Sequence, residues 1–456
     1  MHKKLYLVAG TFLAVSLMAG LAALKFAFSP GQRPANANED AAIPVSVNTA
    51  SAIALAPHQG DEPIDREIRQ LQGKVRTGKQ RPETMKRLGW AFVRKARLSC
   101  DPGYYKLAEQ CALSVEYENP KDPDALLLQG HILDSLHKFR EAESLARNLV
   151  VLRDQATDYG LLGDVLMEQG RLQAAIEPYQ KMINLRPDLE GYLRIAHVRW
   201  LKGDLDGAQE IMKIAVTAAS PREPESAAWA YTRQGSYELQ VGHTEAARGS
   251  AETALGYLQN YPAALLLKAR VLAELRDTQA SIPLLQVAAR RTMLPEYQWV
   301  LADTLREAGR TSEAEAVEHD LLNSGAISDP RTFAVYLATR GQHLQKALAL
   351  AEAELNTRAD IFTLDAMAWA LKANGRLAES REYSQRSLQE GTCDARLFYH
   401  AGSIALANGN YQEAQTWFER ADEIKQMLTP SERNDLAQQF AVVKARETTA
   451  ARSPRN

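Results

Sequence analysis

Apolar residues recur at helical spacing along most of this chain, in pairs of short segments separated by a turn. The stretch GDVLMEQGRLQAAIEPYQKMINLRP reads as two such helices, yet it carries small residues at Gly163, Gly170 and Ala175. Two helices of a hairpin can approach closely only where their side chains are small. We therefore expect Gly163 on the first helix to face Ala175 on the second, with Gly170 in the turn between them.

The spacing of these small residues repeats. Gly163 and Ala175 are twelve residues apart. The same step, intact or degenerate, separates the following pairs: Gly130 and Ala142, Ala196 and Ala208, Gly235 and Ala247, Ala302 and Ala314, Ala368 and Ser380, and Gly402 and Ala414. Near the start of the chain the step is lengthened by an insertion that contains SCDPGYY. We expect about ten hairpins between Pro82 and Lys425, which predicts an extended array rather than a single compact core.

Several residues in and just before the quoted stretch fall at the offsets of a known repeat motif. They are Tyr159, Leu162, Gly163, Leu166, Gly170, Ala175, Tyr179 and Pro187. The stretch resembles the tetratricopeptide repeat (TPR) family, and phrases such as LDAMAWALKANGR resemble long bacterial TPR proteins whose role is not established. The resemblance implies an all-α fold, a right-handed α-solenoid of about ten TPR-like helical hairpins. It also implies that the first helix of each hairpin lines the concave surface.

A repeat array must cover its two terminal faces. An apolar stripe of Ile64, Ile68, Leu71 and Val75 predicts a capping helix before the first repeat. At the other end, Thr429-Pro430-Ser431-Glu432 has the pattern of a capping box, followed by further apolar positions at helical spacing. We therefore assign the solenoid to residues 61–428, and a C-terminal capping helix with a disordered tail to residues 429–456.

The N-terminus carries an uncharged run, Leu5–Leu24, whose twenty residues would span about 30 Å as a helix and match a hydrocarbon core. A cleaved signal peptide usually has a shorter apolar region. We therefore expect one N-terminal hydrophobic helix as an uncleaved signal anchor in residues 1–25, and a flexible linker in residues 26–60. Lys3 and Lys4 favour a cytoplasmic N-terminus. The repeats would then lie on the periplasmic side of the inner membrane. The alternative is cleavage after Ala35-Asn36-Ala37, which would leave an exported, soluble protein.

Charge and candidate chemistry change this picture little. Lys plus Arg (54) nearly balance Asp plus Glu (56), which argues against a basic nucleic-acid groove. The segment GKVRTGKQ resembles a phosphate-binding loop, but it lacks the final Ser or Thr and follows a helical stripe instead of a strand. The sequence contains neither HExxH nor GxSxG. We therefore predict a protein that is not an enzyme and has no cofactor or metal site.

Candidate partner contacts lie at the offsets that face the concave surface in TPR arrays. They are Trp90, Arg94, His131, His197, Trp200, Trp299, Asp303, Arg306, Asp365, Trp369 and Tyr399. Exposed aromatic groups beside charges suit an extended peptide or a partner helix. The tryptophans can equally pack between adjacent hairpins. The family's carboxylate clamp is not reproduced, because Asp164 and Asp303 stand where its Asn would be.

These features predict a membrane-tethered, non-catalytic scaffold that binds a protein or peptide on its concave face. An alternative is a substrate-presenting or assembly subunit of a cell-envelope enzyme complex whose catalytic chain is separate. A third possibility, a regulator that faces the cytosol, requires the inverted membrane topology.

Overall fold

The structure, a computed structural model, describes residues 47–78 and 81–452. These residues fall into two compact units, an N-terminal unit (residues 47–132) and a C-terminal unit (residues 133–452). Across the described residues the regular secondary structure is helical, with no strand. The all-α prediction is therefore confirmed for this part of the chain. The expected N-terminal hydrophobic helix lies outside it, and none of the helices in residues 47–78 and 81–452 has the length and apolar character needed to cross a membrane.

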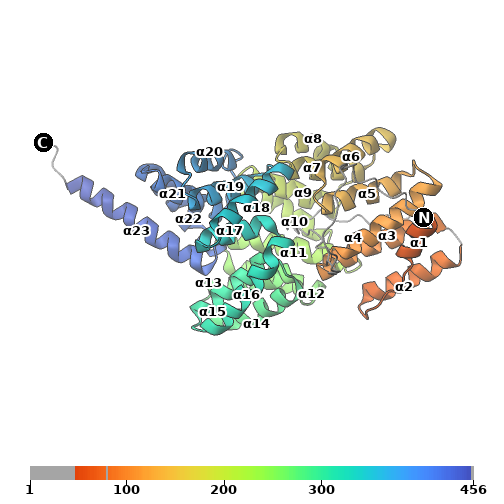
Figure 1. Ribbon diagram of the computed structural model, residues 1–456, viewed down its shortest axis with the longest axis horizontal. Helices are drawn as coiled ribbons and strands as arrows, with labels where there is room; N and C mark the ends of the chain where they lie inside the picture. Colours follow the sequence, from red (N-terminus) through yellow and green to blue (C-terminus); the bar gives the residue numbers. More distant parts are fainter. Residues whose placement is uncertain (1–46, 79–80, 453–456) are drawn as a thin grey trace, which may run out of the picture. The chain divides into compact units, whose positions relative to one another are not determined.

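Helices follow one another with short connections in both units (Figure 1). The N-terminal unit contains α1 (Val47–Ala54), α2 (Pro63–Arg76), α3 (Arg81–Ser99), α4 (Gly103–Glu118) and most of α5 (Pro123–Ser135). The C-terminal unit contains α6 (Phe139–Arg153), α7 (Ala156–Glu168), α8 (Leu172–Leu185), α9 (Leu189–Leu201), α10 (Leu205–Thr217), α11 (Pro224–Gln240), α12 (Thr244–Tyr257), α13 (Pro262–Glu274), α14 (Thr278–Arg291), α15 (Pro295–Glu307), α16 (Thr311–Ser328), α17 (Pro330–Arg340), α18 (Leu344–Thr357), α19 (Ile361–Ala373), α20 (Leu377–Ser387), α21 (Ala395–Ala407), α22 (Tyr411–Glu423), the 3-10 helix η1 (Lys425–Met427) and α23 (Pro430–Arg452).

In the N-terminal unit, residues 47–54 form a helix within the segment that the sequence predicted to be a linker. Helix α1 packs on α4, where the Ser51 and Ser114 hydroxyls lie 2.7 Å apart. Ala50 and Ala54 on its buried face are too small to give a clear apolar periodicity, which explains the wrong prediction for these residues. The predicted capping helix is confirmed as α2, whose apolar stripe is buried.

The C-terminal unit is a succession of helical hairpins, from α7 and α8 to α21 and α22. Most of the first helices end at a glycine with positive φ; these glycines are Gly170, Gly203, Gly242, Gly309, Gly341, Gly375 and Gly409. Between α13 and α14, Arg276 adopts the left-handed conformation instead. The turn that the sequence assigned to Gly170 is therefore confirmed, and it recurs through the array.

The partner of Gly163 differs from the expectation. A Cβ atom on Gly163 would lie 2.3 Å from the ring of Tyr179, and one on Gly402 would lie 2.4 Å from the ring of Phe418. Ala175 is one helical turn before Tyr179, and it is fully buried without being the residue that Gly163 faces. The small residue of the first helix therefore makes room for an aromatic ring of the second helix, which fills the space that a larger side chain would occupy.

Ala175→Leu should nonetheless destabilise the chain by about 1–3 kcal/mol, because three additional heavy atoms have no space in a fully buried position. Urea unfolding followed by circular dichroism checks this. Gln173→Leu is the matched control, since Gln173 is exposed two residues earlier on the same helix. Equal denaturation midpoints for the two variants would contradict the packing of α8.

Two superhelical turns of the helical array in the C-terminal unit lie against each other. A Cβ atom on Gly170 would lie 2.2 Å from the carbonyl oxygen of Ala359, and one on Gly203 would lie 2.5 Å from that of Gly391. Polar contacts join the same regions: Arg358 with Glu168 at 3.4 Å, Lys202 with Glu390 at 2.6 Å, Thr392 with Leu201, and Gln426 with the carbonyl oxygens of Leu239 and Gln240 at 3.0 Å. We call this line of contacts the seam; Figure 1 shows α19 beside α7 and α9.

At the C-terminal end, the predicted capping box is confirmed. The backbone N–H of Thr429 donates to the Glu432 carboxylate at 2.9 Å, and the N–H of Glu432 lies 3.4 Å from the Thr429 hydroxyl. Leu436, Phe440 and Val443 are buried on α23 as expected. The helix continues to Arg452, into the segment that the sequence assigned to a tail.

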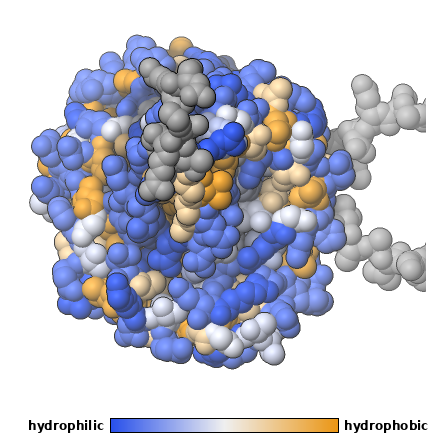
Figure 2. Space-filling model, turned by 90° about the vertical axis from the view of Figure 1, so that its left-hand side faces the viewer, coloured by the Kyte–Doolittle hydropathy of each residue, from blue (hydrophilic) through white to orange (hydrophobic). Residues whose placement is uncertain are grey.

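The outer surface is mainly polar on the face viewed from the side of α23. Figure 2 shows that hydrophobic residues lie there in small groups among hydrophilic ones. Scattered apolar residues of this kind are normal on a soluble surface and mark no binding site by themselves. A candidate site is therefore better sought on the concave side of the helices.

Candidate functional site

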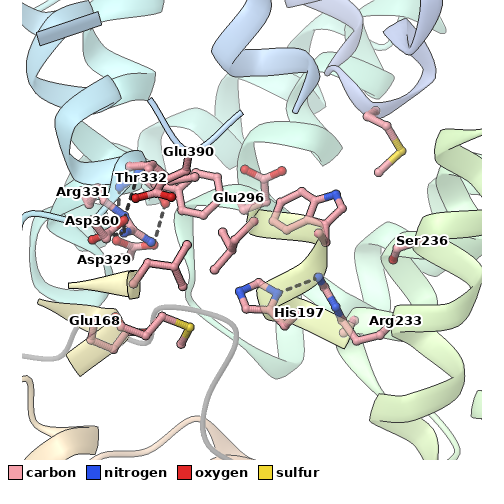
Figure 3. A pocket seen from close by; sticks show the side chains of 18 of the residues that line it. Glu168, His197, Arg233, Ser236, Glu296, Asp329, Arg331, Thr332, Asp360 and Glu390 are labelled. Carbon is pink, nitrogen blue, oxygen red and sulfur yellow. Dashed lines mark hydrogen bonds and ion pairs between the residues drawn. The ribbon is translucent and has the colours of Figure 1, made fainter. Parts of the chain in front are cut away.

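A cavity of about 380 Å³ lies within the C-terminal unit. Its lining comes mainly from the first helices of consecutive hairpins, α7, α9, α11, α13, α15, α17 and α19. These are the helices that the sequence placed on the concave face. Figure 3 shows side chains from several of them converging on one space. Residues of the seam, including Gly170 and Glu390, also contribute to the lining. The cavity therefore lies where two superhelical turns of the array meet.

Aromatic rings form one part of the cavity lining. The rings of Trp200 on α9 and Phe362 on α19 are stacked at a centroid distance of 6.1 Å, and His197 stacks on Trp200 at 5.5 Å. The indole N–H of Trp200 donates to the side-chain oxygen of Gln240 at 3.1 Å. Gln240 in turn donates to the carbonyl oxygen of Cys393 at 2.6 Å. The stacked rings therefore form a contact between the two superhelical turns. The hydrogen bonds of Gln240 at the seam fix the position of Trp200.

Arg233 on α11 lies beside these rings. Its guanidinium carbon is 5.5 Å from the ring centre of Trp200, 5.7 Å from that of Trp229 and 4.9 Å from that of Tyr237. Its Nη2 donates to the Tyr237 hydroxyl at 2.9 Å. The same Nη2 lies 3.2 Å from Nδ1 of His197 (Figure 3). Cation–π contacts of this kind orient a guanidinium without neutralising its charge.

His197 is neutral in this environment. Burial, and next the positive charge of Arg233, lower the pKa of His197 well below its usual range. A neutral imidazole can accept a hydrogen bond at Nδ1, which the contact with Arg233 requires. Arg233 therefore carries the positive charge of this pair alone.

This lowered pKa predicts a pH-dependent stability. In the unfolded chain a histidine takes up a proton near pH 6.5, whereas folded His197 does not. The unfolded state therefore binds more protons as the pH falls below about 6.5, and stability is lost by at most about 1.4 kcal/mol per pH unit for this one group. Urea unfolding at about pH 7 and about pH 5 measures the loss.

His197→Gln should reduce this loss, because glutamine keeps an acceptor for Arg233 but does not titrate. His319→Gln on α16 is the control, since His319 is exposed. If the wild type and His197→Gln lost equal stability between the two pH values, the assignment of a buried neutral histidine would be wrong.

Several other charged residues of the lining are paired, whereas Arg386 has only a cation–π contact among the described residues, with its guanidinium carbon 4.9 Å from the Tyr383 ring centre. Arg270 pairs with Glu296 at 2.7 Å, and Arg331 pairs with Asp360 at 3.0 Å. Burial would raise the pKa of Asp360, but Arg331 and Arg358 outweigh it and hold that pKa below its usual range. Figure 3 shows Arg331, Asp360, Asp329 and Glu390 grouped away from Arg233. The lining is therefore electrostatically uneven: Arg331 and Asp360 form a pair in one part, whereas Arg233 has no carboxylate partner among the described residues in the other.

Two of the candidate contacts from the sequence, His197 and Trp200, line this cavity. The group on α15 has partners within the chain. Trp299 is fully buried, with the guanidinium carbon of Arg396 lying 5.0 Å from its ring centre. Asp303 is bound by Arg340 and by the backbone N–H of Ser431 at 3.1 Å. Arg306 is exposed but pairs with Glu318 of the same hairpin.

The remaining candidates are distributed over both units. Asp365, Trp369 and Tyr399 are buried, and the His400 ring stacks on Trp369 at 3.9 Å while its Nδ1 contacts Asp365 at 2.8 Å. In the N-terminal unit, Trp90 and His131 form an edge-to-face pair at 5.2 Å, and Arg94 pairs with Glu67 at 2.7 Å. The structure gives all of these side chains packing or pairing partners. Their contact with another protein stays a prediction.

The sequence analysis did not select Trp229, Arg233 or Phe362. Trp229 and Phe362 each lie six residues before the small residue of their helix, which is Gly235 and Ala368 respectively. This position in the repeat is one of those that face the concave surface in TPR arrays. Extending that offset to the degenerate repeats would have found both. Arg233 lies two residues before Gly235, outside the concave offsets, and its long side chain reaches the cavity.

The comparisons with known proteins agree with the repeat pattern. Residues 117–190 and 232–294 match one model of the tetratricopeptide repeat, and residues 395–426 match another. None of the curated proteins matches the chain.

Similar solved structures include the Cut9–Hcn1 hetero-tetramer of APC/C, with 16% identity over 84% of this chain and 78% of that chain and a TM-score of 0.44. A TPR protein from Parabacteroides merdae is 18% identical over 56% of this chain and 98% of that one, with a TM-score of 0.32. A thermophilic TPR protein of Thermus thermophilus is 21% identical over 43% of this chain and 99% of that one, with a TM-score of 0.35. The matched residues lie in helical hairpins of the structure, and this chain therefore contains tetratricopeptide repeats.

Proposed function

We propose that this protein is a non-catalytic scaffold that binds a protein or peptide partner on the concave face of its C-terminal unit, around the cavity. The observation that supports the proposal most is the lining of that cavity, where stacked aromatic rings adjoin a guanidinium. Tryptophan and arginine are the residues in which binding energy concentrates at protein interfaces. Grooves of this size and mixed character suit an extended segment of polypeptide.

Site-specific photocrosslinking in cells tests this proposal. A photoreactive amino acid at Ser236 or Gln389, both of which line the cavity, should capture the same partner, identified by mass spectrometry. The controls are Lys213 on α10 and Arg248 on α12, which are exposed on second helices. Capture of the same protein from Lys213 and Arg248, with none from the cavity positions, would contradict binding at the concave face.

The proposal includes a membrane tether formed by Leu5–Leu24, which lies outside the described residues. If this run is an uncleaved anchor, the full chain should fractionate with membranes and resist extraction with alkaline carbonate, and its N-terminus should be intact by mass spectrometry. The repeats would then lie on the periplasmic side of the inner membrane. A mature chain that begins directly after Ala37 would instead indicate an exported, soluble protein.

A further inference from the structure

We infer that Arg233 binds an acidic side chain, Asp or Glu, in an extended internal segment of the partner, and that an adjacent apolar residue of this segment packs on the aromatic lining. This inference rests on the proposed function, because it assigns the chemistry of the segment that the cavity receives. It is carried by the charge of Arg233, by the arrangement of its N–H groups and by the course of the lining helices.

Arg233 differs from Arg270 and Arg331 in its partners. It differs from Arg386, which also lines the cavity without an ion pair to any described residue, in its position beside the stacked ring of Trp200. Arg270 and Arg331 each have a carboxylate at hydrogen-bond distance, Glu296 and Asp360 respectively. Arg233 instead contacts a neutral imidazole and a phenol. Within residues 47–78 and 81–452 it has no ion pair with a carboxylate. A guanidinium without a counter-ion in an aromatic cavity is complementary to an anionic ligand.

The hydrogen bonds of Arg233 leave some N–H groups of its guanidinium available. Both contacts, to Tyr237 and to Nδ1 of His197, are made by Nη2. Nε and Nη1 make no hydrogen bond to any other described residue, so their N–H groups can donate to a ligand carboxylate. The three rings at 4.9–5.7 Å limit the orientations of the guanidinium. Little side-chain entropy would then be lost when a carboxylate binds.

The aromatic lining determines the second feature expected of the ligand, an apolar residue. Trp200, Trp229 and Phe362 all line the cavity, and Trp200 stacks on Phe362. These rings offer apolar surface directly beside the charged group. A ligand residue next to the acidic one would gain from burial if it were aromatic or large and aliphatic.

The position of the cavity favours an internal segment over a chain terminus. Its lining runs from α7 to α19 along consecutive first helices, and Arg233 on α11 lies within this run and not at either end of it. The carboxylates of Glu168, Asp329, Asp360 and Glu390 lie on the side away from Arg233 (Figure 3). Arg331 on that side is already paired with Asp360 and offers no free charge to a second acidic group, which favours a single Asp or Glu in an otherwise apolar or polar context.

A peptide library on the purified full chain tests the inference. The probe is a positional-scanning library of nonapeptides with acetylated N-termini and amidated C-termini, with binding read by fluorescence polarisation. We expect selection for Asp or Glu at one internal position and for an aromatic or large aliphatic residue next to it. Replacing that acid by Asn or Gln in the best peptide should weaken binding about tenfold or more.

Variants of the chain then identify the acid's partner. Arg233→Met should weaken the acidic peptide about tenfold or more but leave the Asn or Gln peptide unchanged, whereas Arg233→Lys should recover part of the affinity. Arg199→Met is the control, because Arg199 pairs with Asp204 outside the cavity lining. Circular dichroism checks that each variant is folded. If Arg233→Met does not fold, Arg233→Lys and the peptide pair decide the question, with weaker binding to the acidic peptide expected for Arg233→Lys.

Any of three binding results would overturn the inference. They are selection without an internal acid, an acidic peptide whose affinity does not depend on Arg233, and binding that requires a free C-terminal carboxylate. The absence of any bound peptide would also count against it. The proposed function is judged separately, because photocrosslinking from Ser236 and Gln389 reports a concave-face partner of any chemistry.

Discussion

Replacing Arg194 with Met should lower the free energy of unfolding by about 3–5 kcal/mol, because it breaks a buried ion pair and leaves an unpaired charge. Arg194 on α9 donates from Nε and Nη2 to the two carboxylate oxygens of Asp164 on α7, at 2.9 and 2.7 Å. The two residues are only 1% and 3% exposed. Without the guanidinium, Asp164 would keep the hydrogen bond from Tyr179 but would lose its counter-ion. Urea unfolding followed by circular dichroism measures the effect.

Arg199→Met is the matched control for this substitution. It lies on the same helix and removes the same side chain from an ion pair, but the side chains of Arg199 and Asp204 are each 46% exposed. Exposed pairs of this kind contribute about 0–1 kcal/mol. The double variant Asp164→Asn with Arg194→Met should recover part of the lost stability, because residue 164 then carries no charge that has lost its counter-ion. Similar losses for Arg194→Met and Arg199→Met would contradict the buried pair between the first helices.

The second large effect concerns the seam. Alanine at Gly170 or Gly203 should cost about 1–2 kcal/mol for the positive φ and about 1–3 kcal/mol more for the contact with the facing backbone. The facing atoms are carbonyl oxygens, which cannot move aside as the end of a flexible side chain can. Thermal and urea unfolding of the full chain measure both variants.

The array supplies matched controls for these glycines. Gly309 and Gly375 occupy the equivalent turns with φ of 76°, and a Cβ atom on either would meet no described atom within 4 Å. Alanine at these positions should show only the cost of the left-handed conformation. The difference between the two pairs of variants isolates the contact between turns. If all four variants were equally destabilised, the turns would not be in contact in solution.

The helical hairpins were predictable from the sequence because residues close together along the chain determine each of them. The turn glycines, the buried small residues and the capping box before α23 all follow from spacing along the chain. The exact partner of Gly163 was not predictable in the same way. Ala175 and Tyr179 are one helical turn apart on the same face, and only packing decides which of them fills the space beside the glycine.

The seam and much of the cavity were not predictable from local patterns. Gly170 meets Ala359 and Trp200 meets Phe362 only because the array returns on itself, and the cumulative rotation of many hairpins sets that return. A single repeat motif does not contain this information. The concave offsets therefore found His197 and Trp200, whereas no local pattern indicated that Phe362 lies beside them.

Hydrogen–deuterium exchange of the full chain, alone and with the partner captured by crosslinking, tests the central proposal most directly. Binding at the cavity should slow the exchange of backbone amides in the first helices that line it, above all α9, α11 and α19. The second helices α10, α12 and α14 should be unchanged. Slower exchange confined to those second helices, with no change in α9, α11 and α19, would place the partner on another surface and contradict the account.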